Sequence, residues 1–214
     1  MTRLLIMGAP GAGKGTQAAR LAIELSVPAI STGDMFRDQV KLETTLGRQV
    51  QDIIAAGDYV PDALTNKIVD ERLTQDDAST GFILDGYPRT ADQVTHLDLL
   101  LEMQGTNLDA VIHLEIDMKQ LLSRLFKRAD AQGRADDSPQ TIQHRLETYD
   151  LTTGPLLEEY KSRGRLITVD GLASMEEVTK AILHALHHRA YFVPTFALGS
   201  AARRGDTITP LKMV

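Results

Sequence analysis

Short apolar runs recur along the chain and are separated by longer segments in which apolar residues follow a helical spacing. None of the runs exceeds eight residues, and turn-forming residues lie beside most of them. Runs of this length and composition predict strands. The predicted strands are 3–7, 27–31, 81–85, 109–116 and 165–170.

The intervening segments read as helices. Residues 14–25 show the pattern well, because Ala18, Leu21, Ala22 and Leu25 fall on one helical face. Further helices are predicted at 90–104, 117–128, 138–163 and 174–188. Strands that alternate with helices indicate a parallel sheet covered on both faces. We therefore expect an α/β protein, a three-layer α/β/α fold around a five-stranded parallel sheet.

Two segments interrupt this alternation. Residues 32–73 are almost wholly helical and separate the second strand from the third, and residues 129–137, "ADAQGRADD", are polar and lie between two helices. Both are expected to be attachments to a core domain that consists of 1–31, 74–128 and 138–189.

Residues 190–214 extend beyond the last predicted helix. The segment begins with apolar residues, among them Tyr191, Phe192 and Phe196, so it could form an extra strand or a packing arm, or remain disordered. It is an extension of unknown role.

Composition and charge exclude several classes of protein. The 23 basic and 29 acidic residues give a net charge of −6, which argues against binding a nucleic acid polymer. The chain has no cysteine, so disulfides and thiolate zinc sites are excluded. No segment approaches the roughly 20 apolar residues of a membrane span, and no signal peptide is apparent. A cytoplasmic protein without membrane contact is expected.

The stretch "GAPGAGKGT" at residues 8–16 joins the first strand to the first helix. A glycine-rich turn followed by a lysine and a helix is typical of a phosphate cradle, in which backbone N–H groups and the helix N-terminus face the anion. Gly8, Gly13 and Lys14 fit the usual spacing, whereas Gly15 occupies the Ser/Thr position and Thr16 follows one residue later. A glycine turn kept only for packing is the alternative.

The stretch "GFILDGYPRT" at residues 81–90 places an acidic residue at the end of a predicted strand. The carboxyl ends of parallel strands are where open α/β folds bind ligands, and Asp85 there could hold Mg²⁺ through water. Gly86 allows close approach of a ligand, and Pro88 stiffens the turn before Arg89. The alternative is an acidic strand end followed by a solvated turn.

Six stretches in this order carry a family resemblance: "GAPGAGKGTQ", "ISTGDMFR", "GDYVP", "GFILDGYPRTADQ", "GRADD" and "HRLETY". The chain resembles adenylate kinases of the short-lid form, within the nucleoside monophosphate kinase superfamily and the P-loop NTPase fold. The resemblance extends from residue 1 to about residue 189. It implies that 32–73 binds the monophosphate, that 129–137 is a short lid, and that the enzyme uses Mg²⁺ to convert ATP and AMP reversibly into two ADP.

The resemblance also implies roles for individual residues. The expected catalytic residues are Lys14, Arg89, Arg128, Arg134 and Arg145. The expected ATP site consists of Gly11, Ala12, Gly13, Lys14, Gly15, Thr16, Arg124 and Arg128. The expected AMP site consists of Thr32, Arg37, Asp58, Tyr59, Val60, Gly86, Arg89, Gln93, Arg134 and Arg145. Arg124 would stack on the donor base, and Asp85 would position Mg²⁺.

Two other functions fit parts of this pattern. Another nucleoside monophosphate kinase, for UMP or CMP, would share the loop and the arginines, although threonines at 32 and 90 and Gln93 favour the adenylate members. A non-catalytic nucleotide-binding regulator is a different class, but it has little use for so many cations around one phosphate. Structural zinc is not expected, because residues 129–137 contain neither Cys nor His. A monomer with ATP, AMP and ADP as its partners is expected.

Overall fold

The computed structural model describes residues 2–132 and 138–190, with the backbone alone at 128–132 and 189–190. The expectations for the rest of the predicted lid and for the C-terminal extension therefore lie outside the described residues.

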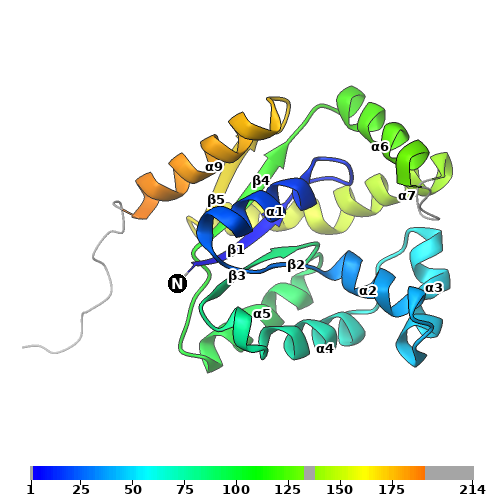
Figure 1. The fold of residues 1–214 in the computed structure, drawn as a ribbon, viewed down its shortest axis with the longest axis horizontal. Helices are drawn as coiled ribbons and strands as arrows, with labels where there is room; N and C mark the ends of the chain where they lie inside the picture. Colours follow the sequence, from blue (N-terminus) through cyan, green and yellow to red (C-terminus); the bar gives the residue numbers. More distant parts are fainter. Residues whose placement is uncertain (1, 133–137, 191–214) are drawn as a thin grey trace, which may run out of the picture.

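Five parallel strands form the centre of the fold (Figure 1). They are β1 (Thr2–Met7), β2 (Ala29–Ser31), β3 (Gly81–Asp85), β4 (Ala110–Glu115) and β5 (Leu166–Asp170). Their spatial order is β2-β3-β1-β4-β5, and Leu4 of β1 is paired with Ile83 and Ala110 on its two sides. After β1 the chain crosses to β2 at one edge of the sheet, whereas after β4 it crosses to β5 at the opposite edge. This reversal beside β1 is where open α/β sheets form a ligand crevice at their carboxyl ends.

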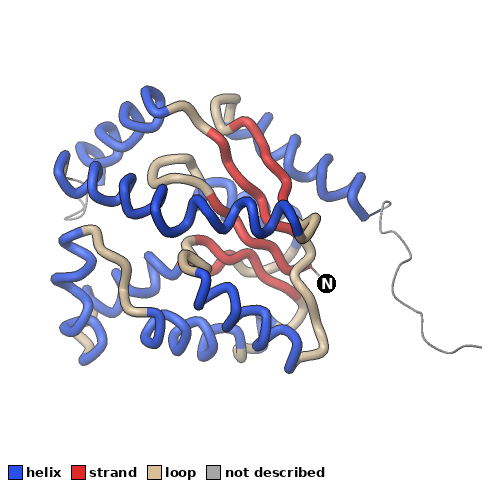
Figure 2. The backbone as a smooth tube through the Cα atoms, turned by 180° about the vertical axis from the view of Figure 1, so that it is seen from behind, coloured by secondary structure: helices blue, strands red, loops and turns tan. Residues whose placement is uncertain are grey.

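Helices cover both faces of the sheet, as Figure 2 shows from behind. The α-helices are α1 (Lys14–Leu25), α2 (Thr32–Lys41), α3 (Thr45–Ala56), α4 (Asp62–Leu73), α5 (Ala91–Met103), α6 (Met118–Gln132), α7 (Pro139–Thr148), α8 (Gly154–Ser162) and α9 (Met175–Ala190). Helices α1 and α9 pack on one face, and α4, α5 and α8 pack on the other. The predicted α/β class, the parallel sheet and its five strands are confirmed.

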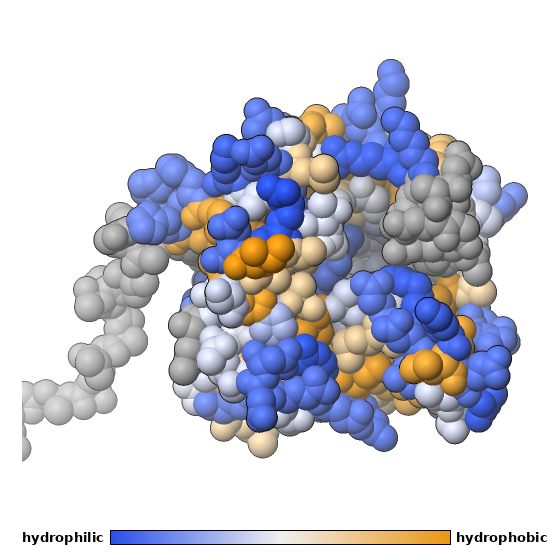
Figure 3. Space-filling view, in the orientation of Figure 1, coloured by the Kyte–Doolittle hydropathy of each residue, from blue (hydrophilic) through white to orange (hydrophobic). Residues whose placement is uncertain are grey.

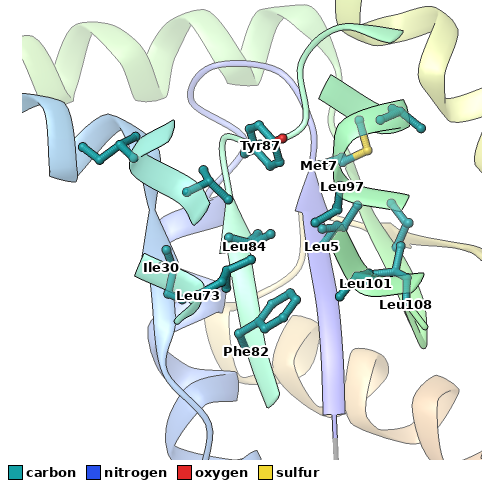
Figure 4. Packing of buried hydrophobic residues seen from close by; sticks show 14 of the residues in the cluster. Leu5, Met7, Ile30, Leu73, Phe82, Leu84, Tyr87, Leu97, Leu101 and Leu108 are labelled. Carbon is teal, nitrogen blue, oxygen red and sulfur yellow. The ribbon is translucent and has the colours of Figure 1, made fainter. Parts of the chain in front are cut away.

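Strand β1 supplies both layers of the core because its side chains alternate between the two faces. Leu4 and Ile6 are buried against the α1 and α9 layer. Leu5 and Met7 face the opposite layer, where they lie near Leu97 of α5 (Figure 4). Burial on both faces explains why the strand is apolar from Leu4 to Met7.

The predicted helical insert consists of α2, α3 and α4, with α2 and α3 capped by side chains. Ser31 accepts a hydrogen bond from the backbone N–H of Asp34, and Thr44 accepts one from Gly47. Such caps satisfy N–H groups that the first turn leaves without a partner. Phe36 of this segment is buried in the same cluster as the sheet residues. The insert is thus packed continuously onto the core.

Two predicted helix boundaries were wrong. Residues 138–163 form α7 and α8 with a π-helical turn, η2 (Tyr149–Thr153), between them rather than one α-helix. Pro155 at the start of α8 has no N–H to donate to the carbonyl of Leu151, and this missing bond accounts for the wider turn. Helix α6 continues to Gln132, past the predicted end at residue 128, because "ADAQ" contains good helix formers.

In the view of Figure 3, most of the residues at the periphery of the molecule are hydrophilic. Highly exposed apolar side chains such as Ile23, Met103 and Leu151 belong to different elements. Within residues 2–132 and 138–190, no helix combines the length and the apolar character needed to cross a membrane.

Candidate functional site

The loop between β1 and α1 can pass close to its neighbours only because it is rich in glycine. Gly8 has φ +145°, and a Cβ there would lie 2.8 Å from the carbonyl oxygen of Leu114. Gly11 has φ +89°, and a Cβ there would lie 2.7 Å from Cγ of Leu125. Positive φ and close approach both favour glycine. The glycines therefore bring the loop backbone against β4 and α6 at the carboxyl edge of the sheet.

Lys14 is the first residue of α1, and its side chain folds back onto this loop. Its Nζ donates hydrogen bonds to the carbonyl oxygens of Gly8 at 2.7 Å and Ala9 at 3.0 Å. The N-cap residue Gly13 has no side chain, so no capping side chain accepts a hydrogen bond from the first backbone N–H groups of α1. An ammonium group and these N–H groups are the kinds of donor that an anion site requires.

A cleft of about 720 Å³ opens over this loop. Its walls contain much of the predicted ATP site together with several cationic residues. They include Gly11, Ala12, Gly13, Lys14, Gly15, Thr16, Arg37, Asp85, Gly86, Arg89, Arg124 and Arg145. The fold thus brings together side chains from the loop, the insert, β3, α6 and α7.

A smaller cavity adjoins the cleft on the side of the insert. The described residues of the predicted AMP site all line it: Thr32, Arg37, Asp58, Tyr59, Val60, Gly86, Arg89, Gln93 and Arg145. Arg37, Arg89 and Arg145 line both the cleft and this cavity. The two spaces therefore share three arginines, and guanidinium groups are suited to phosphate oxygens.

Arg89 is held on several sides. Its Nε donates to the carbonyl oxygen of Gly86 at 2.8 Å, and its guanidinium lies 4.7 Å from the ring centroid of Tyr59. The Tyr59 hydroxyl lies 3.0 Å from Oγ1 of Thr153, which in turn donates to the carbonyl oxygen of Arg89. Tyr59 was predicted to line the cavity, but its contact with Arg89 was not predicted.

Asp85 ends β3 at the edge of the cleft and lies close to the loop, since a Cβ on Gly15 would be 3.4 Å from Asp85 Oδ2. Burial raises the pKa of Asp85 above its ordinary value, and this effect outweighs the opposing charges of Lys14 and Arg89. A carboxylate that is poorly hydrated and faces a phosphate cradle is suited to a cation that enters with the phosphates.

The other predicted arginines differ in what they contact. Arg37 donates to Oδ1 of Asp34 at 2.6 Å, within α2. Arg124 donates to the carbonyl oxygen of Gly171 at 2.9 Å, and both residues line the cleft. The Arg128 side chain and the whole of Arg134 lie outside the described residues.

Sequence reasoning missed one wall of the cleft. Leu114, Gly171, Ala173, Met175 and Val178 line it, and four of the five lie in the β5–α9 connection or in α9. The signal was available, because a loop that follows a parallel strand emerges at the same sheet edge as the loop after β1. These apolar groups suit the flat face of a base.

The comparisons with known proteins agree with this geometry. A family model described as "Adenylate kinase" matches residues 6–165. The chain belongs to the adenylate kinase family. It is therefore a phosphotransferase with a P-loop, and the resemblance stated from the sequence is confirmed.

Curated adenylate kinases are similar over most of the chain. The adenylate kinase of Clavibacter michiganensis is 53% identical over 189 residues, which cover 88% of this chain and 94% of the relative. The adenylate kinase of Leifsonia xyli is 54% identical over 186 residues, covering 87% and 94%. The adenylate kinase of Kocuria rhizophila is 53% identical over 186 residues, covering 87% and 99%.

Adenylate kinases use Mg²⁺ as a general feature of the family, and the cleft can be tested for its fit to this ion. Among the described residues, no group of three or more His, Asp or Glu side chains is arranged to hold a metal alone. Among the described residues that line the cleft, two carry a carboxylate, Asp85 and Asp34. Mg²⁺ is commonly bound by one or two carboxylates together with substrate phosphates and water, so this donor set fits a Mg²⁺–nucleotide complex.

Proposed function

We propose that the enzyme transfers the γ-phosphoryl group of ATP to AMP, giving two ADP, with ATP in the larger cleft and AMP in the adjoining cavity. The observation that carries this assignment is the position of Arg37, Arg89 and Arg145 on the walls of both spaces. Phosphoryl transfer needs the attacking and leaving oxygens in line, with their charge neutralised and water excluded. Two polyanions that meet at shared arginines would have their reacting oxygens brought into line and their charge neutralised.

The donor side is assigned from the loop outward. The loop backbone from Gly11 to Thr16 and the N-terminus of α1 hold the β- and γ-phosphates, and Lys14 supplies a charge beside them. Arg124 and the apolar wall at Gly171 and Met175 face the base. Mg²⁺, when bound with ATP, would neutralise charge on the phosphate oxygens, and Asp85 would hold it.

The acceptor side is assigned from the smaller cavity. Arg37 and Arg89 bind the AMP phosphate, and Thr32, Tyr59, Val60 and Gln93 surround the base. Arg145, with Arg128 and Arg134, binds the group in transfer. The acceptor phosphate is already an anion, so no general base is required.

The test is a coupled assay of ADP formation with ATP and, in turn, AMP, UMP, CMP and GMP at equal concentrations. Turnover with AMP far above that with the other monophosphates is the expected result. Comparable or higher rates with UMP or CMP would favour a different monophosphate kinase. ATP binding without ADP formation from any of the four would favour a regulator.

Tyr59 supports Arg89, so replacing it should weaken AMP binding selectively. Tyr59→Leu removes both the aromatic face under the guanidinium and the hydroxyl beside Thr153, and we expect KM for AMP to rise about 2- to 30-fold, as for the loss of a cation–π contact of about 0.5–2 kcal/mol. Tyr59→Phe retains the aromatic face and should change KM less. Steady-state titrations of AMP and ATP check this, and an equal rise in both KM values would contradict it.

A further inference from the structure

The side-chain amide of Gln93 is held by one hydrogen-bond donor and one hydrogen-bond acceptor. Its side chain is 1% exposed and lines the smaller cavity. The amide oxygen, Oε1, accepts a hydrogen bond from the backbone N–H of Arg89 at 2.7 Å. The amide nitrogen, Nε2, donates one to Oδ1 of Asp62 at 2.6 Å. A backbone N–H can only donate and a carboxylate can only accept, so these two partners fix which end of the amide is which.

Asp62 is itself held in place. It is the first residue of α4, and its second oxygen, Oδ2, accepts a hydrogen bond from Oγ1 of Thr90 at 2.7 Å. Thr90 is the N-cap of α5 and accepts a hydrogen bond from the backbone N–H of Gln93 at 3.2 Å. Asp62, Thr90 and Gln93 therefore form a closed ring of hydrogen bonds. Turning the amide over would oppose two oxygens at Asp62 and two N–H groups at Arg89.

We propose that Asp62 is a positioning residue for acceptor choice: it locks the Gln93 amide in the orientation that selects a base with an amino group beside an unprotonated ring nitrogen. This inference rests on the proposed function, because it concerns the cavity assigned to AMP. The amide has two acceptor sites and two N–H groups, and one of each is used within the described residues. One acceptor site and one N–H remain for a base.

The locked amide distinguishes 6-amino from 6-oxo purines. Adenine offers its N6 amino group to the free acceptor site of Oε1, and its N1 or N7 accepts from the free N–H of Nε2. Hypoxanthine places O6 against Oε1 and, on its N1 edge, an N–H against the N–H of Nε2. On the N1 edge of hypoxanthine, an oxygen then faces an oxygen and an N–H faces an N–H, so neither contact is a hydrogen bond. An amide that could turn over would accept this edge equally well.

The first experiment uses the wild-type enzyme and three monophosphates. Calorimetry measures the Kd of AMP, of purine riboside 5′-monophosphate, which lacks any group at C6, and of IMP. A locked amide gives the order AMP, then purine riboside 5′-monophosphate, then IMP, from tightest to weakest. If IMP binds as tightly as purine riboside 5′-monophosphate, or more tightly, the amide turns over and the proposal is wrong. This comparison does not depend on whether a variant folds.

The second experiment removes half of the lock. In Asp62→Asn the new side chain can meet either end of the Gln93 amide, while the Arg89 N–H remains. We expect the ratio of kcat/KM for AMP to that for IMP to fall about tenfold, the effect of relaxing one base contact. The fall should come mainly from KM.

Asp70→Asn is the matched control. It makes the same chemical change on the same helix, but Asp70 contacts Nε2 of His96 at 2.8 Å rather than Gln93, so the ratio should stay at the wild-type value. A folded Asp62→Asn enzyme with an unchanged ratio would overturn the proposal. Failure of the proposed function would look different, because the wild-type enzyme would then not turn over AMP at all.

Discussion

Replacing Lys14 by methionine is expected to lower kcat at least a thousandfold while the protein stays folded. Methionine keeps a flexible, unbranched side chain, one atom shorter, but removes the ammonium group that donates to the carbonyl oxygens of Gly8 and Ala9. That group is the positive charge contributed by the loop itself, beside the phosphates that the proposed function places there. Fixed charges aimed at a migrating phosphoryl group contribute about 10³- to 10⁵-fold in related reactions.

The measurement is kcat from the coupled ADP assay, with far-ultraviolet circular dichroism to show that the variant is folded. Lys67→Met is the matched control, because its side chain is 74% exposed and its nearest described carboxylate, Glu71, is 4.0 Å away. The control should retain wild-type kcat. A Lys14→Met enzyme within tenfold of the wild-type rate would show that the loop only binds the nucleotide.

The features that the sequence predicted well depend on local patterns. Strand β3 is apolar because both of its faces are buried, so its run of hydrophobic residues identifies it without knowledge of its neighbours. The loop at 8–13 was predictable for a related reason: close approach to other backbone requires glycine, and glycines are visible in a sequence. Asp85 could be placed at the sheet edge because it directly follows such a strand.

The features that the sequence did not predict depend on contacts between distant residues. Nε2 of His144 lies 2.6 Å from Oδ1 of Asp58, which joins α7 to the insert across 86 residues of sequence. The same holds for Asp62 and Gln93, which are separated by 31 positions. Asp58 and Gln93 were expected in the AMP site, but no local pattern identifies the distant residue with which each is paired. The π turn at η2 is different, because Pro155 is a local signal of a break that the prediction of one helix over 138–163 did not use.

Asp85→Asn is expected to make the enzyme at least a hundredfold slower and, without nucleotide, more stable at pH 7. The loss of rate follows from the role proposed for Asp85, because an amide is a poorer partner for hydrated Mg²⁺ and fixed electrostatic groups contribute about 10²- to 10³-fold to kcat. The gain in stability follows from burial, which raises the pKa of Asp85 and so makes its ionised form unfavourable in the folded state. Asparagine has the same shape without the charge.

The sign and the pH range follow from proton linkage. Because the folded protein holds the Asp85 proton more tightly than the unfolded chain, the stability associated with this group is fully present below its ordinary pKa of 3.8 and is lost as the pH rises through the raised value. The asparagine variant does not titrate there. The stability advantage of the asparagine variant should be absent in acid and should grow as the pH rises from 3.8 through the raised pKa of Asp85.

Thermal unfolding of both proteins across this pH range, without nucleotide or Mg²⁺, measures the effect. Asp77→Asn is the opposite case. The hydrogen bond from Arg72 lowers the pKa of Asp77, so the ionised form is favoured in the folded protein, and replacing Asp77 by asparagine should not raise Tm at pH 7. A drop in Tm for Asp85→Asn at pH 7 would mean that Lys14 and Arg89 stabilise the ionised carboxylate more than burial penalises it. An enzyme that is more stable but slow would show that Asp85 is kept for catalysis at the expense of stability.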